Sequence, residues 1–157
     1  AMFSILGGRV EGGRFLDLFA GTGRVGLEAL RRGAESCVFV ESVKARAESL
    51  RKIAGNSVVL GLEVRRAVSW LTKRGMTFDV IFADPPYSSG WSEELPAVSG
   101  LRELFSEGAV MIVEHSVREE LTLSRNPNTL EIVSVREYGE TCLTFLQAQE
   151  LLLQAQE

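Results

Sequence analysis

The chain has 157 residues, of which 45% are hydrophobic and 24% are charged, and this composition is typical of a single globular domain. No apolar run approaches the roughly 20 residues of a membrane helix, and no secretory signal is visible at the first residues. Cys37 and Cys142 lie far apart and form no CxxC pair, which excludes a disulfide scaffold and leaves no zinc signature. We therefore expect a cytoplasmic α/β or α+β domain with two small buried cysteines and no metal.

The formal net charge of −4 hides an uneven distribution along the chain. Residues 1–78 hold 13 Lys and Arg against 7 Asp and Glu, whereas residues 79–157 hold 4 against 14. A difference of this size fits a protein in which one face meets a polyanion while the other repels it. It fits equally well two solvated faces without a partner.

Short apolar segments alternate with amphipathic ones along the chain. Strands are predicted over residues 14–19, 36–41, 60–65, 78–83, 109–114, 130–136 and 141–146. Helices are predicted over residues 25–32, 44–54, 68–74 and 101–106, and residues 88–100 are expected to form a loop with at most a helical turn. This alternation predicts right-handed βαβ units and a mostly parallel sheet, and the turn at 138–140 adds a C-terminal hairpin with one antiparallel strand.

The end of the chain repeats the string LQAQE at 146–150 and again at 153–157. Its composition favours a helix, but a duplication so near the end need not belong to the fold. We therefore expect one domain over residues 1–146 and a repetitive tail of unassigned role over residues 147–157.

A glycine-rich loop with the pattern GxGxxG, formed by Gly21, Gly23 and Gly26, joins the first predicted strand to the first predicted helix. Alone, this pattern suits a dinucleotide dehydrogenase or a tight strand–helix turn. Asp17 stands just ahead of the loop and would repel a pyrophosphate. Glu41 ends the next strand, where a ribose-binding acid is usual. The two acids favour S-adenosylmethionine (AdoMet), which carries a sulfonium and an ammonium and no phosphate.

The motif Asp84-Pro85-Pro86-Tyr87 follows the strand predicted at 78–83, and its two prolines must end that strand. Ligands of open α/β sheets bind outside the carboxyl ends of the strands, so this motif and the glycine loop should share one cleft. Methylation of an exocyclic amine needs acceptors for the amine hydrogens, and Asp84 and the Pro85 carbonyl can serve. Tyr87 offers a ring on which a base can stack. The alternative is a strand exit merely stiffened by prolines.

Residues 15–41, ADPPY at 83–87, VEH at 113–115 and YGET at 138–141 together resemble the bacterial methyltransferases of guanine N2 in 16S ribosomal RNA. The resemblance covers most of residues 2–146. It implies the Rossmann-like, seven-stranded class I AdoMet-methyltransferase fold, AdoMet as cofactor, and 16S rRNA or an assembling small ribosomal subunit as partner. No membrane and no metal are implied, and we expect a monomer.

The same resemblance assigns roles to individual residues. The implied catalytic residues are Asp84, Pro85, Pro86 and Tyr87. The implied cofactor-binding residues are Asp17, Phe19, Ala20, Gly21, Thr22, Gly23, Glu41, Ser42, Arg66, Ala67 and Asp84. His115, the only histidine, is expected to have a structural or substrate-edge role because amine methylation does not need it.

Three features depart from the family pattern. Residues 1–6 resemble the middle of a family helix, so the arginine-rich segment that precedes it in the family, implicated in RNA contact, is expected to be missing. The pI of about 5.2 is acidic for an RNA enzyme, in keeping with that loss. The Asp or Asn that meets the adenine amine in relatives corresponds here to Arg66, so we expect that contact elsewhere, such as at the Ala67 backbone.

Other functions stay open at this point. The same chemistry could serve adenine N6 in DNA or RNA, or a protein glutamine, and the DPPY motif does not separate these amines. An AdoMet-fold binding module that has lost catalysis is a further alternative, against which the intact motif argues. A dinucleotide oxidoreductase is a third, against which Asp17 and the DPPY motif argue.

Overall fold

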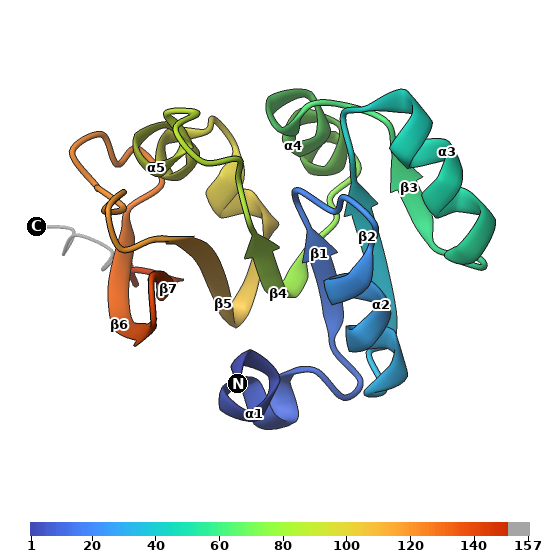
Figure 1. The fold of residues 1–157 in the computed structure, drawn as a ribbon, viewed down its shortest axis with the longest axis horizontal. Helices are drawn as coiled ribbons and strands as arrows, with labels where there is room; N and C mark the ends of the chain where they lie inside the picture. The colour runs from blue at the N-terminus through green and yellow to red at the C-terminus, as the bar shows by residue number, and fades with distance from the viewer. Residues whose placement is uncertain (151–157) are drawn as a thin grey trace, which may run out of the picture.

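The computed structural model describes residues 1–150, which form one seven-stranded sheet with the strand order β3-β2-β1-β4-β5-β7-β6. Edge strands β3 and β6 lie at opposite ends of the molecule (Figure 1). The strands are β1 (Arg14–Asp17), β2 (Ser36–Val40), β3 (Val58–Leu60), β4 (Phe78–Ala83), β5 (Phe105–Ser116), β6 (Leu130–Tyr138) and β7 (Thr141–Ala148). The helices are α1 (Met2–Leu6), α2 (Arg24–Arg31), α3 (Lys44–Ile53), α4 (Val64–Lys73) and α5 (Trp91–Glu94), with 3-10 turns η1 (Gly7–Arg9), η2 (Leu95–Ala97) and η3 (Leu101–Leu104).

The sheet has the mixed topology that the sequence predicts. Strands β1 to β5 pair in parallel, and β7 runs antiparallel to both of its neighbours, β5 and β6. The hairpin between β6 and β7 turns at Gly139, whose φ of 64° suits a glycine. The predicted α/β fold with a single antiparallel strand in a C-terminal hairpin is therefore confirmed.

Two apolar layers cover the sheet because alternate residues of each strand point to opposite faces. In β1, Phe15 packs in the layer under α1, α2 and α3, whereas Leu16 packs in the layer under α4, η2 and η3. In β4, Phe82 and Ile81 divide in the same way. The fold is thus a three-layer sandwich whose central strands are buried on both sides.

Two predicted elements are misplaced. The strand expected over 60–65 is β3 at Val58–Leu60, because Glu63 caps α4 by accepting the Arg66 backbone N–H at 2.9 Å and so starts the helix at Val64. The helix expected over 101–106 is only a 3-10 turn, and residues 105 and 106 already belong to β5. In both places the pattern of apolar residues does not reveal where one element ends and the next begins.

Strand β7 runs to Ala148, past the domain boundary expected at residue 146, and Ala148 pairs with Leu130 of β6. The helix expected from the first LQAQE string is therefore wrong for residues 146–148. Its second copy, at 153–157, lies outside the described residues.

Both cysteines are buried and free, as expected, and burial raises the pKa of the Cys37 thiol. Within residues 1–150, no helix has the length and apolar character needed to cross a membrane.

Candidate active site

The glycine loop joins β1 to α2 and owes its shape to close packing. Gly23 caps α2 with a φ of 83°, and a side chain there would overlap Leu50 of α3. A Cβ at Gly26 would overlap the Phe39 ring and stand 2.7 Å from the Cys37 Sγ atom of β2. These glycines therefore let α2 lie directly against β2 and α3, which fixes the loop at the carboxyl end of β1.

Asp17 ends β1 as a buried carboxyl that accepts a backbone hydrogen bond. Its side chain is 1% exposed, and its Oδ2 atom accepts the Gly26 backbone N–H at 3.2 Å. Its Oδ1 atom is buried and has no hydrogen-bond partner within the described part of the chain. Burial raises the pKa of Asp17 to about 7, and the nearby carboxylates of Asp84 and Glu41 add to the effect.

Glu41 follows β2 and ties the loop to the next strand. Its Oε1 atom accepts the Gly21 backbone N–H at 2.8 Å, and its Oε2 atom accepts the Val43 backbone N–H at 2.8 Å. Both oxygens keep a further lone pair for a ligand. Glu41 therefore holds the loop in place while it still presents acceptors beside it.

The DPPY motif leaves β4 in a turn that later residues hold in place. Ser88, with a φ of 56°, donates its backbone N–H to the Glu119 carboxylate, 3.0 Å from each oxygen. The Ser89 hydroxyl donates to the Pro86 carbonyl at 2.5 Å. The Tyr87 side chain is 64% exposed. The turn therefore presents an aromatic ring to solvent on a backbone that is fixed from both sides.

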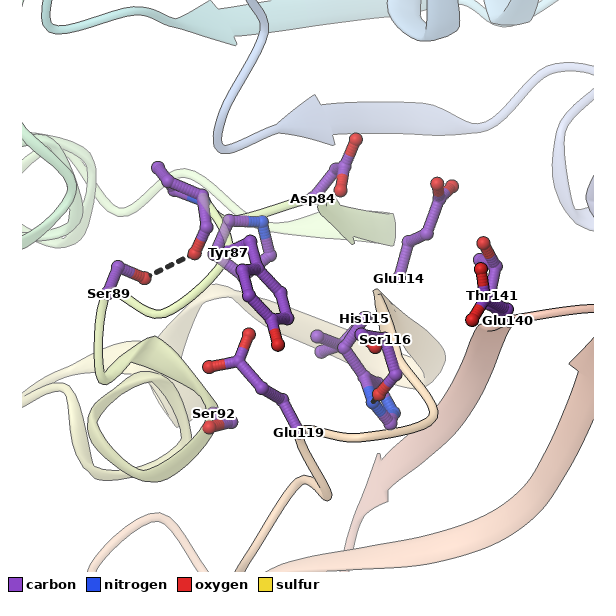
Figure 2. A pocket seen from close by; sticks show the side chains of 13 residues that line it. Asp84, Tyr87, Ser89, Ser92, Glu114, His115, Ser116, Glu119, Glu140 and Thr141 are labelled. Carbon is purple, nitrogen blue, oxygen red and sulfur yellow. Dashed lines mark hydrogen bonds between the residues drawn. The ribbon is translucent and has the colours of Figure 1, made fainter.

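Two cavities meet at this motif. The first has a volume of about 420 Å³ and is lined by Asp17, Phe19, Ala20, Gly21, Thr22, Arg24, Val25, Glu41, Ser42, Val43, Arg46, Phe82, Asp84 and Pro86. The second has a volume of about 230 Å³ and is lined by Asp84, Pro85, Pro86, Tyr87, Ser89, Ser92, Val113, Glu114, His115, Ser116, Glu119, Glu140 and Thr141 (Figure 2). Asp84 and Pro86 belong to both lists, so they form the shared wall of the two cavities.

The shared wall is acidic. Partial removal from bulk water raises the pKa of Asp84, and the Arg24 guanidinium opposes this shift. The pKa of Glu114 is raised by the same cause and by the charge of Asp84, and Arg24 again opposes it. Arg24 therefore faces both carboxylates from the start of α2. Within residues 1–150, no group of three or more His, Cys, Asp or Glu side chains is arranged to hold a metal ion.

Most of the expected site residues line these cavities, and three do not. Gly23 lies beneath the loop and acts through packing. Arg66 is exposed in the first turn of α4, where its backbone N–H bonds to Glu63. Ala67 is fully buried, and its backbone N–H donates to the Glu63 carbonyl at 2.9 Å, so this N–H is engaged within α4 and the expected adenine contact at this backbone stays a prediction.

Sequence reasoning missed several lining residues of both cavities, among them Val43, Arg46, Glu114 and Glu119. Glu114 lies near the carboxyl end of β5, the position at which the rule for open α/β sheets predicts ligands. That signal could have identified Glu114. Arg46 and Glu119 carry no such signal, because they reach the cavities only through the folding of α3 and of the loop after β5.

His115 lines the second cavity, and both of its ring nitrogens have partners in the protein. Its Nδ1 atom lies 2.9 Å from the Ser116 carbonyl, and its Nε2 atom lies 2.7 Å from the Thr144 hydroxyl. The carbonyl can only accept, so Nδ1 carries the proton and Nε2 accepts from the hydroxyl. With both nitrogens occupied, the imidazole orients the end of β5.

Trp91 lies outside both cavities. Its ring meets Phe19 edge to face, with 5.4 Å between the ring centroids, and the Arg65 guanidinium lies 4.5 Å above it. It therefore packs against the wall of the site and does not close over the second cavity.

The strand order and the paired cavities at the carboxyl ends of β1, β2, β4 and β5 define a class I methyltransferase fold. The chain belongs to the family described as Conserved hypothetical protein 95, whose model matches residues 1–147.

Named relatives support this assignment. The chain is 32% identical over 148 residues to the Bacillus subtilis protein named "Putative rRNA methyltransferase YlbH". This alignment covers 90% of this chain and 79% of the Bacillus protein. The chain is 31% identical over 125 residues to Ribosomal RNA small subunit methyltransferase D of Escherichia coli strain K12. This alignment covers 76% of this chain and 62% of the Escherichia coli protein. The predicted kinship with small-subunit rRNA methyltransferases is thereby confirmed.

Solved structures agree with the fold. The Escherichia coli protein yhhF superposes with a TM-score of 0.79 at 27% identity, over 96% of this chain and 85% of that one. A Streptococcus pyogenes protein superposes with a TM-score of 0.73 at 29% identity, over 92% of this chain and 91% of that one.

Proposed function

We propose that the protein is an AdoMet-dependent methyltransferase that acts on the exocyclic N2 amine of a guanine in 16S rRNA. The observation that carries this proposal is the shared wall formed by Asp84 and Pro86 between two cavities. A methyl donor in one cavity and an amine in the other would meet at that wall. The names of the two relatives support ribosomal RNA as the substrate, and the Escherichia coli name supports the small subunit. An enzyme with this substrate would act in the cytoplasm.

The first cavity fits AdoMet in its chemistry. Asp17 offers a buried oxygen that has no hydrogen-bond partner among residues 1–150, which suits the ammonium or sulfonium of AdoMet and would repel a phosphate. Glu41 offers acceptors beside the glycine loop, which suit ribose hydroxyls. The volume of about 420 Å³ lies in the range of small-molecule sites. The arrangement therefore favours AdoMet over a dinucleotide.

Residues of the DPPY motif that line the second cavity would orient the amine. The lone pair of a nucleobase amine is delocalised into the ring, and acceptors on its two hydrogens draw the nitrogen toward a tetrahedral form. The Asp84 carboxylate and the Pro85 carbonyl are the acceptors at this point, and Tyr87 provides a ring on which the base stacks. This positioning would supply most of the acceleration.

AdoMet, when bound, supplies a methyl group whose bond to sulfur breaks with the electron pair left on sulfur, which gives S-adenosylhomocysteine. The nitrogen that gains the methyl group becomes positively charged and must lose one proton. Asp84 is placed to accept that proton and to pass it to water through the open second cavity. No stronger base is needed, because the proton leaves an already charged nitrogen.

A methyl-transfer assay tests the proposal. Labelled AdoMet is incubated with the protein and with either 16S rRNA or small-subunit particles that lack the modification, and the RNA is digested to nucleosides. We expect label in N2-methylguanosine. Label in N6-methyladenosine, or in protein glutamine, would replace guanine by another amine. Binding of S-adenosylhomocysteine without any transfer would favour the inactive binding module.

A further inference from the structure

Two of the carboxylates that face the second cavity have no donor of their own. Glu119 is occupied by a backbone N–H, and Glu140 pairs with Arg118 at 3.1 Å. Within residues 1–150, neither the Asp84 carboxylate nor the Glu114 carboxylate accepts a hydrogen bond from the protein. Of these four carboxylates, Asp84 and Glu114 are therefore the two that no protein hydrogen bond occupies within the described residues, although the Arg24 charge lies near both.

The sheet places these two carboxylates side by side. Ala83, the last residue of β4, pairs with Val113 of β5 in parallel register, so Asp84 directly after β4 comes next to Glu114 of β5. Neighbouring strands lie about 4.8 Å apart, and residues at the same level of a parallel pair point to the same face. Figure 2 shows both carboxylates on the same side of the pocket, beyond the Tyr87 ring.

Two adjacent acceptors match two adjacent donors on the substrate. Guanine presents the N1–H next to the N2 amine, so its edge carries only donors there. Adenine places the lone pair of N1 next to its N6 amine, and a glutamine amide places a carbonyl oxygen next to its nitrogen. The Asp84 carboxylate could accept a hydrogen bond from any of these amines. A second carboxylate beside Asp84 would be repelled by the N1 lone pair of adenine and by the carbonyl oxygen of glutamine, but not by the N1–H of guanine.

We infer that Glu114 accepts the N1–H of the target base and thereby selects guanine over adenine and over a side-chain amide. The inference rests on the proposed function and deepens it, because it names the residue that tells the candidate amines apart. Glu114 acts here as a specificity-determining residue and Asp84 as the acceptor for the reacting amine. A site built to bind an N–H discriminates strongly against an analogue that lacks it.

The experiment compares guanine with 2-aminopurine at the target position of otherwise identical RNA. Both bases carry the 2-amine, but 2-aminopurine has a lone pair on N1 and no N1–H. We expect the wild type to methylate guanine RNA far faster than 2-aminopurine RNA. The rate with guanine RNA divided by the rate with 2-aminopurine RNA should fall about 10- to 100-fold in Glu114→Gln. The reason is that the glutamine amide can turn its NH2 group toward the N1 lone pair of 2-aminopurine.

Matched variants separate the outcomes. Glu114→Ala should slow methylation of guanine RNA without any gain on 2-aminopurine RNA, and Glu137→Gln, on β6 outside both cavities, should leave the ratio unchanged. Binding of S-adenosylhomocysteine shows that each variant is folded, since Glu114 does not line the first cavity. An unchanged ratio in Glu114→Gln, with guanine methylated normally, would overturn the inference and leave the proposed function standing. Failure of the wild type to methylate any guanine would overturn both.

Discussion

Ionisation of the buried Asp17 carboxyl lowers the free energy of unfolding, because the charged form is less stable in the folded protein than in the unfolded chain. Asp17→Asn should remove this destabilisation. Burial raises the pKa of this carboxyl from 3.8 to about 7. Between about pH 4 and about pH 7 the folded protein therefore holds a proton that the unfolded chain has lost. The free energy of unfolding must fall as the pH rises through this window, and it stays lower above it. An asparagine amide has no proton to lose there.

The size of the effect follows from the two pKa values. At about 1.4 kcal/mol per pH unit, the complete penalty is about 4 kcal/mol, of which about 3 kcal/mol develops between about pH 5 and about pH 8.5. The stability of Asp17→Asn relative to the wild type should rise by that amount over the same range. Denaturant unfolding at both pH values measures it, and the comparison with the wild type cancels the other titrating groups. The asparagine oxygen can still accept the Gly26 N–H.

Ligand binding gives an independent measure of the same proton. At about pH 7 roughly half of the molecules carry a proton on Asp17, and the ammonium of S-adenosylhomocysteine would displace it. Isothermal titration in two buffers of different ionisation enthalpy should show release of about half a proton per ligand bound. Asp17→Asn should bind more weakly and release none. A stability difference that does not change with pH, together with binding that releases no proton, would refute this reasoning.

Four further predictions concern the rest of the site. Asp84→Ala should lower methyl transfer by about 100-fold or more, while titration shows that S-adenosylhomocysteine still binds; loss of that binding would contradict the assigned role. Because the pKa of Asp84 is raised and its ionised form is the acceptor, wild-type activity should fall on acidification at a higher pH than for an ordinary Asp, as a pH–rate profile would show. Tyr87→Ala should slow transfer by about 10- to 100-fold through lost stacking, and Tyr87→Phe should lose far less; equal losses would exclude stacking. Gly26→Ala should destabilise the fold by about 1–3 kcal/mol in urea unfolding, whereas Gly8→Ala, where a Cβ meets nothing within 4 Å, should be close to neutral.

The amino-acid sequence by itself determined the class of fold and the centre of the site. Apolar strands that alternate with amphipathic helices leave few topologies besides a mostly parallel sheet. All parallel strands present their carboxyl ends at one edge, so Asp17, Glu41 and Asp84 could be assigned to one cleft from their positions at or near the ends of predicted strands. Local chemistry was enough here, because these residues are placed by the strands that carry them.

Only the tertiary structure decided which residues complete the site. Glu114 is a partner of Asp84 because β4 and β5 pair in one particular register, and Glu119 holds the turn at Ser88 from 31 residues away. Arg66 lines neither cavity and lies in the first turn of α4, because a cap at Glu63 starts this helix where the sequence suggested a strand. Strand registers, caps and returning loops depend on contacts between distant segments, and no short window of sequence contains both halves of such a contact.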